Sequence, residues 1–114
     1  MGYNYPMYAL RHDTTPEGQD LFAQWLSKLR DRHAQARIAA RLLRLQNGNF
    51  GECRFVGGGV WEQKIDWGAG YRVYYAIEGK NVVLLCDGGD KRTQDTDIER
   101  AITRWSEWQQ RSKK

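Results

Sequence analysis

The sequence predicts an α+β fold in which an N-terminal strand and a helical hairpin pack on a four-stranded antiparallel meander, followed by a C-terminal helix. Two observations lead to this prediction. Apolar residues recur at helical spacing before residue 48 and after residue 94, whereas they largely alternate with polar ones between residues 50 and 87. A chain of 114 residues fits a single domain, expected to span 1–114, with its helices on one face of the sheet.

The N-terminal part should contain one strand and two helices. Residues 3–10 alternate aromatic and small side chains, which is typical of a short strand. Residues 14–17 combine a threonine cap, a proline and an acid, so the first helix should begin there. Residues 31–34 interrupt the helical spacing, and a second helix should then run to Gly48, a residue type that often ends helices. One face of this second helix carries Arg37, Arg41 and Arg44.

The apolar period changes to two after Phe50, which predicts the meander. Four strands are expected, separated by glycine-rich or polar turns. The turns lie at residues 57–59, 68–70 and 78–81. The last strand, residues 82–87, is almost continuously apolar and should lie in the interior of the sheet. The chain is helical again from Gln94, and one side of that helix is apolar. Its apolar residues are Ile98, Ala101, Ile102, Trp105 and Trp108.

Charge, cysteine content and hydropathy limit the kinds of partner, metal site and cellular location that we expect. The net charge is +4 and the pI is about 9.2, a modest basic excess that suits a polyanionic or an acidic protein partner. Cys53 and Cys86 both fall in predicted strands without histidine ligands nearby, so we expect reduced cysteines rather than a zinc site. Apolar runs are too short to span a membrane. The first residues lack a basic region followed by an apolar core, so we expect a cytoplasmic protein without a signal peptide.

Cations and tyrosines recur together on the strands of the meander. If the apolar residues of these strands face the helices, alternation places Lys64, Arg72 and Tyr74 together on the opposite, open face of the sheet. Point charges on a rigid sheet, with the flat rings of Tyr71 and Tyr74 beside them, are what a small domain needs to hold RNA phosphates and bases. For Lys64, a merely solvated cation is the alternative reading.

Two further cations follow the most buried strand. Gly88 and Gly89 precede Lys91 and Arg92, and glycines at such a point allow a backbone or a phosphate to approach closely. We therefore expect both cations to contact RNA. The spacing of glycines and lysine excludes a P-loop, and an ordinary polar turn is the alternative.

Motifs of other enzyme classes are missing from the sequence. It contains no serine nucleophile elbow, no histidine–glutamate metal motif and no evident pair of carboxylates. His12 and His33 fall in a predicted loop and at a predicted helix end, where we expect them at the surface. We therefore expect neither a metal enzyme nor a serine hydrolase, and no cofactor.

The order of motifs resembles the RelE/ParE toxin superfamily and, within it, the HigB-like, phage-derived addiction module killer branch. The motifs are Phe22-x-x-Trp25-Leu26, Gly48-Asn49-Phe50-Gly51, Gly59-Val60-Trp61-Glu62, Gly68-Ala69-Gly70-Tyr71-Arg72-Val73-Tyr74-Tyr75 and Gly88-Gly89-Asp90-Lys91-x-x-Gln94-x-x-Asp97-Ile98. The last two are fairly specific in combination and weak singly.

This resemblance implies a RelE-like fold and a bacterial toxin with a small cognate antitoxin of the helix-turn-helix type. RelE-type members cut mRNA in the ribosomal A site without a metal ion. By resemblance, Arg72 matches the catalytic arginine of the Gly-Tyr-Arg strand. Lys91, with Arg92 adjacent, matches the basic residue after the last central strand, and Lys64 matches the basic residue before the hairpin.

The chain departs from that pattern at its C-terminal end. It has Trp105 and Trp108 where the best-studied members have a catalytic tyrosine or histidine. The general base therefore stays open between Glu62 and a lysine with a lowered pKa. Two other functions also stay open: a ParE-like inhibitor that binds DNA gyrase without catalysis, and a plain interaction domain.

Overall fold

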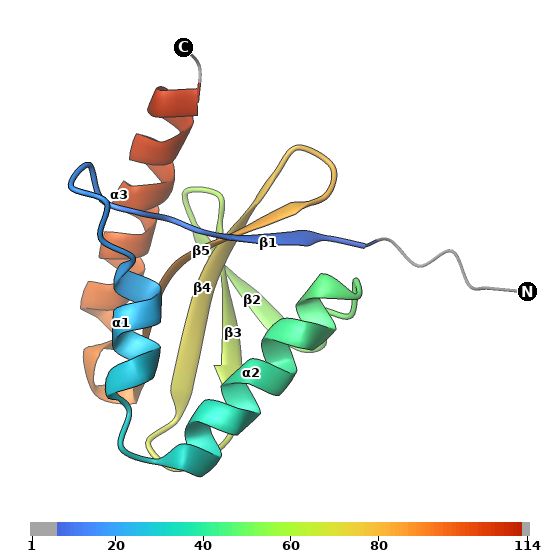
Figure 1. Ribbon diagram of the computed structural model, residues 1–114, viewed down its shortest axis with the longest axis vertical. Coiled ribbons are helices and arrows are strands. Elements are labelled where there is room, and N and C mark those ends of the chain that lie inside the picture. Colours follow the sequence, from blue (N-terminus) through green and yellow to red (C-terminus); the bar gives the residue numbers. More distant parts are fainter. Residues whose placement is uncertain (1–6, 113–114) are drawn as a thin grey trace, which may run out of the picture.

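The computed structural model describes residues 7–112, which form a five-stranded mixed sheet and three α-helices (Figure 1). The fold class is therefore α+β, as predicted. In chain order the elements are β1 (Ala9–His12), α1 (Leu21–Lys28), α2 (Arg32–Gln46), β2 (Cys53–Gly57), β3 (Val60–Ile65), β4 (Tyr71–Glu78), β5 (Val82–Gly89), the 3-10 turn η1 (Lys91–Thr93) and α3 (Gln94–Ser112). Within residues 7–112, no helix is both long enough and apolar enough to cross a membrane.

The strands lie in the order β1-β5-β4-β3-β2. Strands β2 to β5 form the predicted meander, but β1 pairs with β5 in parallel and adds a fifth strand. The prediction of a four-stranded, wholly antiparallel sheet was therefore wrong. The pairing places Leu10 opposite Val83. These residues are far apart in the sequence, so no local sequence pattern predicts that β1 pairs with β5. The strand predicted at residues 3–10 begins at Ala9, and residues 1–6 lie outside the described part of the chain.

Helix α1 begins at Leu21, so the start predicted at residues 14–17 was wrong. Asp20 is the N-cap, and its Oδ1 accepts a hydrogen bond from the Ala23 amide at 2.9 Å. The residues before it form a turn that includes Gly18 with a φ of 83°. This left-handed conformation cannot belong to a right-handed helix, and it delays the helix until the next capping residue.

Only a short link separates α1 from α2, and the two helices form the predicted hairpin. Asp31 caps α2 by accepting hydrogen bonds from two amides of its first turn. Gln35 of α2 donates hydrogen bonds through Nε2 to the carbonyls of Leu26 and Leu29, at 3.0 and 2.9 Å. The boundary between the helices lies at residues 29–31, slightly before the interruption expected at residues 31–34, because Arg32 already belongs to α2.

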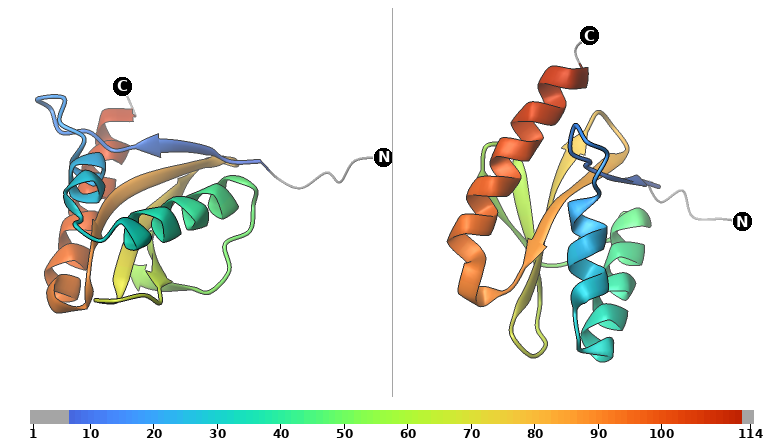
Figure 2. Two further views of the ribbon diagram at one scale, coloured as in Figure 1. Left: turned by 60° about the horizontal axis from the view of Figure 1, so that its bottom comes forward. Right: turned by 60° about the vertical axis from the view of Figure 1, so that its left-hand side comes forward.

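Helices cover both faces of the sheet, so the prediction that they share one face was wrong (Figure 2). On one face, α1 and α2 supply Phe22, Ile38 and Leu45 to a core cluster. On the other face, α3 supplies Ala101 and Trp105 to a second cluster. The residues of β4 serve both clusters in alternation: Val73 and Tyr75 the first, Tyr74 and Ala76 the second. A strand that is buried on both faces has apolar residues on both sides, so its sequence does not indicate which face is open to solvent.

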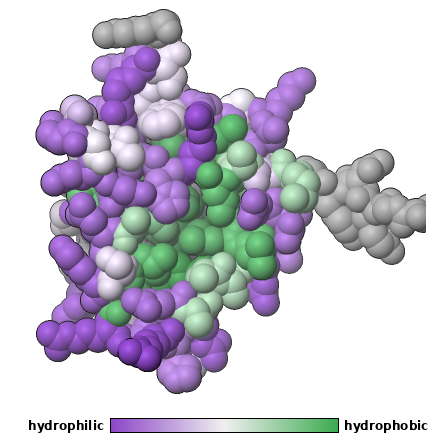
Figure 3. All heavy atoms as spheres, in the orientation of Figure 1, coloured by the Kyte–Doolittle hydropathy of each residue, from purple (hydrophilic) through white to green (hydrophobic). Residues whose placement is uncertain are grey.

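The cysteines and the apolar side chains at the surface agree with a core of two clusters. Both Cys53 and Cys86 are free thiols, and burial raises the pKa of the Cys86 thiol to about 12. Figure 3 shows apolar side chains gathered at the centre of the face that carries α1 and α2, with hydrophilic side chains around them. The exposed large apolar residues include Met7 and Leu43.

Glycines allow the helices to approach β5 closely. A Cβ atom added to Gly88 would overlap the Trp25 ring of α1, and one added to Gly89 would overlap the Asp97 carboxylate of α3. Both helices therefore pack against bare backbone at the end of β5. This close packing positions η1 and the cations that follow the strand.

Gly88→Ala should lower the free energy of unfolding by about 2 kcal/mol or more, because the new methyl group must displace the Trp25 ring. Urea denaturation followed by circular dichroism measures this loss. Gly79→Ala is the matched control: its Cβ would meet open space, and only left-handed strain of about 1 kcal/mol applies. Equal losses in the two variants would contradict the close packing of α1 on β5.

Candidate functional site

Pairing of β3 with β4 collects the predicted site residues on one face of the sheet. Lys64 lies opposite Arg72, and Glu62 lies opposite Tyr74. Directly opposed residues point to the same side, so the prediction that Lys64, Arg72 and Tyr74 share a face is confirmed. The face is not open, however, because Tyr74 is buried in the cluster that α3 completes. The expectation of an open sheet face was wrong, since it did not foresee that α3 packs there.

Beyond the part that α3 covers, this face carries a hollow of about 450 Å³, which we call the cationic hollow. Strands β2, β3 and β4, the residue before β2 and the first residue of α3 contribute its lining. The lining residues are Glu52, Cys53, Arg54, Glu62, Lys64, Arg72 and Gln94. Cations therefore outnumber acids in a space large enough for a phosphate group and its neighbours.

The carboxylate of Glu62 is the hub of this site. Glu62 is only 5% exposed, and its Oε2 accepts hydrogen bonds from the Tyr74 hydroxyl at 3.1 Å and from Gln94 Nε2 at 2.9 Å. The Nε of Arg72 lies 3.6 Å from the same oxygen, and Arg54 Nη2 lies 3.3 Å from Oε1. Glu62 thus links three strands and the start of α3.

Tyr74 belongs to this buried network and has no face available for a base. Burial, and then the negative charge of Glu62, raise the pKa of the Tyr74 phenol, so its hydroxyl stays protonated and donates to Glu62. The hypothesis that Tyr74 stacks on an RNA base therefore conflicts with the structure. Its ring is fully buried under α3, where it supports Glu62.

Arg72 is held from two sides. Its Nη1 donates a hydrogen bond to the Gly70 carbonyl at 2.6 Å, and its Nε faces Glu62 at 3.6 Å, beyond hydrogen-bonding distance. The residue is 7% exposed and its Nε is buried without a hydrogen-bond partner. Because Arg72 also lines the hollow, a guanidinium fixed in this way presents a positive charge of defined position to an anion there.

Gly70 brings Lys91 next to Arg72. The Lys91 amide donates to the Ala69 carbonyl at 3.4 Å, and a Cβ on Gly70 would lie 3.3 Å from Arg72 Nη1 and 3.6 Å from Lys91 Cβ. Arg72 and Lys91 therefore lie close to each other, with only the backbone of Gly70 between them. Lys91 is exposed in η1, so its ammonium group is accessible.

Arg92 and Tyr71 do not join this group. The Arg92 guanidinium turns back to Asp90, with 3.1 Å between Nη2 and Oδ2, and this contact lowers the pKa of the Asp90 carboxyl. Tyr71 packs against the core cluster on the α1 and α2 face, with its ring centroid 6.4 Å from that of Trp25. The structure thus brings together Lys64 and Arg72 in the hollow, while Lys91 lies beside Arg72 across Gly70 and does not line the hollow.

The sequence reasoning missed Arg54 and Gln94 as members of the site. Arg54 lies opposite Glu62 in the pairing of β2 with β3, and Gln94 reaches Glu62 from the first residue of α3. Strand register could have suggested Arg54, since opposite charges often face each other across strands. Gln94 approaches only because α3 folds over the sheet, and the sequence carries no signal for that approach.

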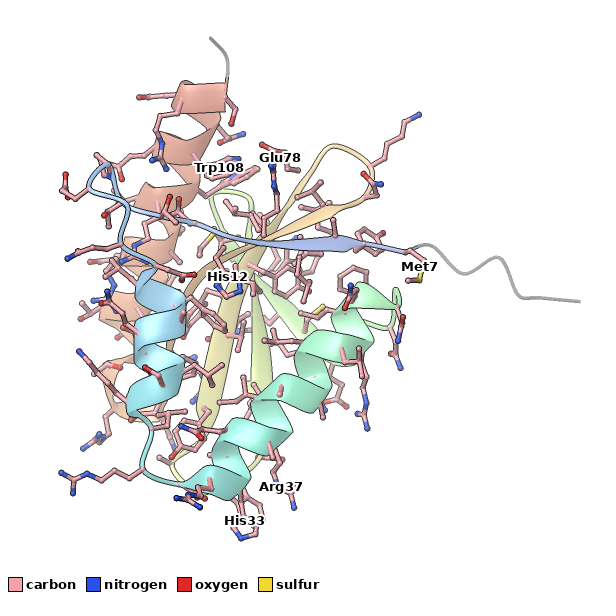
Figure 4. The ribbon with its side chains drawn as sticks, viewed as in Figure 1. Met7, His12, His33, Arg37, Glu78 and Trp108 are labelled. Atoms are coloured by element: carbon pink, nitrogen blue, oxygen red, sulfur yellow. The ribbon has the colours of Figure 1, made fainter. Side chains whose placement is uncertain are left out.

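Neither histidine lines the cationic hollow. Figure 4 shows His12 near α1 and His33 at the start of α2. His12 is the last residue of β1, so the expected loop position was wrong; its side chain is partly exposed at the surface, with Nδ1 2.7 Å from Asp20 Oδ2. His33 is exposed near Trp67 at the start of α2, as predicted. Among residues 7–112, no three His, Cys, Asp or Glu side chains gather as ligands for a metal ion.

Comparison with known proteins places this fold in a family. The profile of the phage-derived Gp49-like proteins (DUF891) matches residues 24–106, most of the chain and the main residues of the site. The chain belongs to the Gp49-like family. This family is associated with addiction module toxins. The Gp49-like chain is also similar to an uncharacterized protein of Haemophilus influenzae, with 51% identity over 80 residues, 70% of this chain and 81% of the relative.

In this Gp49-like protein, Glu62→Gln and Arg72→Gln should each cost about 3 kcal/mol of unfolding free energy, because each leaves a buried charge without its partner. The double variant should lose about 1–3 kcal/mol less than the sum of the two single losses. Urea denaturation of the four proteins measures this coupling. Arg92→Gln is the control, since its exposed ion pair with Asp90 should contribute less than about 1 kcal/mol. Strictly additive losses would show that Glu62 does not hold Arg72.

Proposed function

We propose that this protein is the toxin of a bacterial type II toxin–antitoxin module and that it cuts RNA without a metal ion. Membership of a family linked to such modules supports the toxin role. The resemblance to the HigB-like branch of the RelE/ParE superfamily supports the nuclease. One observation carries the proposal: Arg72 is a largely buried cation, held by Glu62 and Gly70, with Lys64 and Lys91 beside it.

RNA supplies its own nucleophile. The 2′-oxygen attacks the adjacent phosphorus, the bond to the 5′-oxygen breaks, and the hydroxyl proton ends on that leaving oxygen. The products carry a 2′,3′-cyclic phosphate and a 5′-hydroxyl. In the proposed mechanism, Arg72 and Lys91 stabilise the extra negative charge of the transition state, and Lys64 holds a neighbouring phosphate. Because Arg72 is already fixed, little reorganisation is needed when the charge develops.

Glu62 acts in this mechanism as a positioning residue. Its Oε2 is occupied by Tyr74 and Gln94, and its charge holds Arg72 in place. The other groups in the hollow that could transfer a proton are Glu52, Cys53 and Lys64. With so few proton-transfer groups, free RNA should be cut slowly. Messenger RNA on the ribosome is then the proposed substrate, because the ribosome aligns the strand for attack.

The proposed partner is a small cognate antitoxin of the helix-turn-helix type. The apolar surface over α1 and α2 suits a protein partner (Figure 3), and the exposed cations suit an acidic segment. An antitoxin segment that covers the exposed cations would keep RNA from the site and so restrain the toxin.

Arg72→Lys should abolish the growth arrest that the wild-type protein causes when expressed in bacteria. Lysine keeps the positive charge beside Glu62 but loses the planar, two-donor contact with phosphate, and the cleavage rate should fall by about 100-fold or more. Lys91→Ala, on an exposed side chain, should also weaken arrest. Lys80→Ala, exposed in the distant β4–β5 turn, is the control. Thermal melting verifies the fold, and full growth arrest by folded Arg72→Lys would disprove the role of Arg72.

Primer extension on an mRNA in a translating extract should map new 5′ ends when the wild-type protein is added. The same mRNA without ribosomes should stay largely intact, since ribosomal alignment supplies much of the rate. A gyrase supercoiling assay runs in parallel. If the mRNA stays intact and supercoiling is inhibited, the nuclease proposal is wrong and the protein is a ParE-like gyrase inhibitor.

A further inference from the structure

A second pocket adjoins the cationic hollow. It has a volume of about 210 Å³ and lies between the C-terminal half of α2, the loop after it, and β3. Lys64 and Glu52 line both spaces. A ligand too long for the hollow therefore meets this second pocket next.

Three cations border the second pocket. Arg41 and Arg44 come from α2 and Lys64 comes from β3. The Nη2 of Arg41 donates to the Lys64 carbonyl at 3.2 Å, which orients the guanidinium toward the strand. Two acids also line the pocket, Glu52 and Asp66. Asp66 Oδ1 lies 3.7 Å from Lys64 Nζ in an exposed contact of little energy, which a phosphate can replace.

The pocket wall also holds an unpaired acceptor. Gln63 is 2% exposed, and its Nε2 donates to the Phe50 carbonyl at 2.9 Å. Its carbonyl oxygen, Oε1, is buried without a hydrogen-bond partner, which costs about 1–3 kcal/mol in a folded protein. The phosphodiester group of an RNA strand carries no proton and cannot donate to this oxygen. A nucleotide has both parts: a phosphate for the cations and hydroxyl or amino donors for Gln63.

We propose that this second pocket binds a nucleotide next to the cleaved one on the same RNA strand. The inference rests on the proposed function, because it extends the RNA path from the cationic hollow across Lys64 to α2. Grooves that combine spaced cations with contacts to individual nucleotides bind single strands in this way. Arg37 lies toward the other end of α2, near His33 (Figure 4), with its guanidinium 3.9 Å from the Trp67 ring centroid, so it is not part of the pocket.

Fluorescence anisotropy with a labelled single-stranded RNA of about ten nucleotides tests the pocket. Arg41→Ala/Arg44→Ala should weaken binding by about tenfold and lower the slope of log K against log salt by about 1. Arg30→Ala/Arg32→Ala is the matched control, because it removes the same charge from exposed arginines at the opposite end of α2. Asp66→Asn should tighten binding, since it frees Lys64.

Gln63→Leu should weaken RNA binding but leave competition by sulfate unchanged, because the sulfate ion carries no proton to donate to Oε1. Thermal melting verifies each fold, and Arg44→Glu alone, on an exposed side chain, repeats the test if the double variant melts early.

The outcomes separate this inference from the proposed function. Equal losses in the two double variants, or no measurable RNA binding by the wild type, would overturn the pocket. So would a loss of antitoxin binding with unchanged RNA affinity, because the surface would then be a protein interface. Wild-type binding that depends on Arg41 and Arg44, without cleavage on the ribosome, would keep the pocket and refute the nuclease.

Discussion

The buried charge of Glu62 is the constraint on which the site depends. A carboxylate taken out of water costs several kcal/mol unless cations and donors surround it, and here Arg72, Arg54, Tyr74 and Gln94 do so. These contacts form only with the observed strand register, with the first residue of α3 at Glu62 and with the Arg72 guanidinium turned toward Glu62. Electrostatics thus couples the fold of the sheet to the placement of its functional cation.

Coverage of both sheet faces decides where the site can lie. Because α1 and α2 take one face and α3 packs on the other, the hollow on the α3 side lies at the end of β3 and β4 that carries Lys64 and Arg72. Two glycines near this end, Gly70 and Gly88, let Lys91 and α1 approach the backbone. The result is that Arg72 is held in place before any ligand arrives, which is what electrostatic stabilisation of a transition state requires.

Local regularities allowed much of this structure to be predicted. The alternation of β3 and β4 predicted that Lys64, Arg72 and Tyr74 share a face, and helical spacing predicted the hairpin and α3. These predictions depend on periods of two and 3.6 residues, which neighbouring residues carry by themselves. The start of α1 was missed because two capping signals compete within a few residues, and Gly18 decides between them through its left-handed backbone.

The sequence by itself determined the α+β class, the order of the elements, and the cations available on β3, β4 and η1. Only the tertiary structure decided that β1 pairs with β5, that α3 buries Tyr74, and that Arg54 and Gln94 meet at Glu62. These features join residues from distant segments, so they follow from which apolar surfaces bury each other and which charges must be paired. A short stretch of sequence cannot predict these contacts, because it never contains both of the residues that form them.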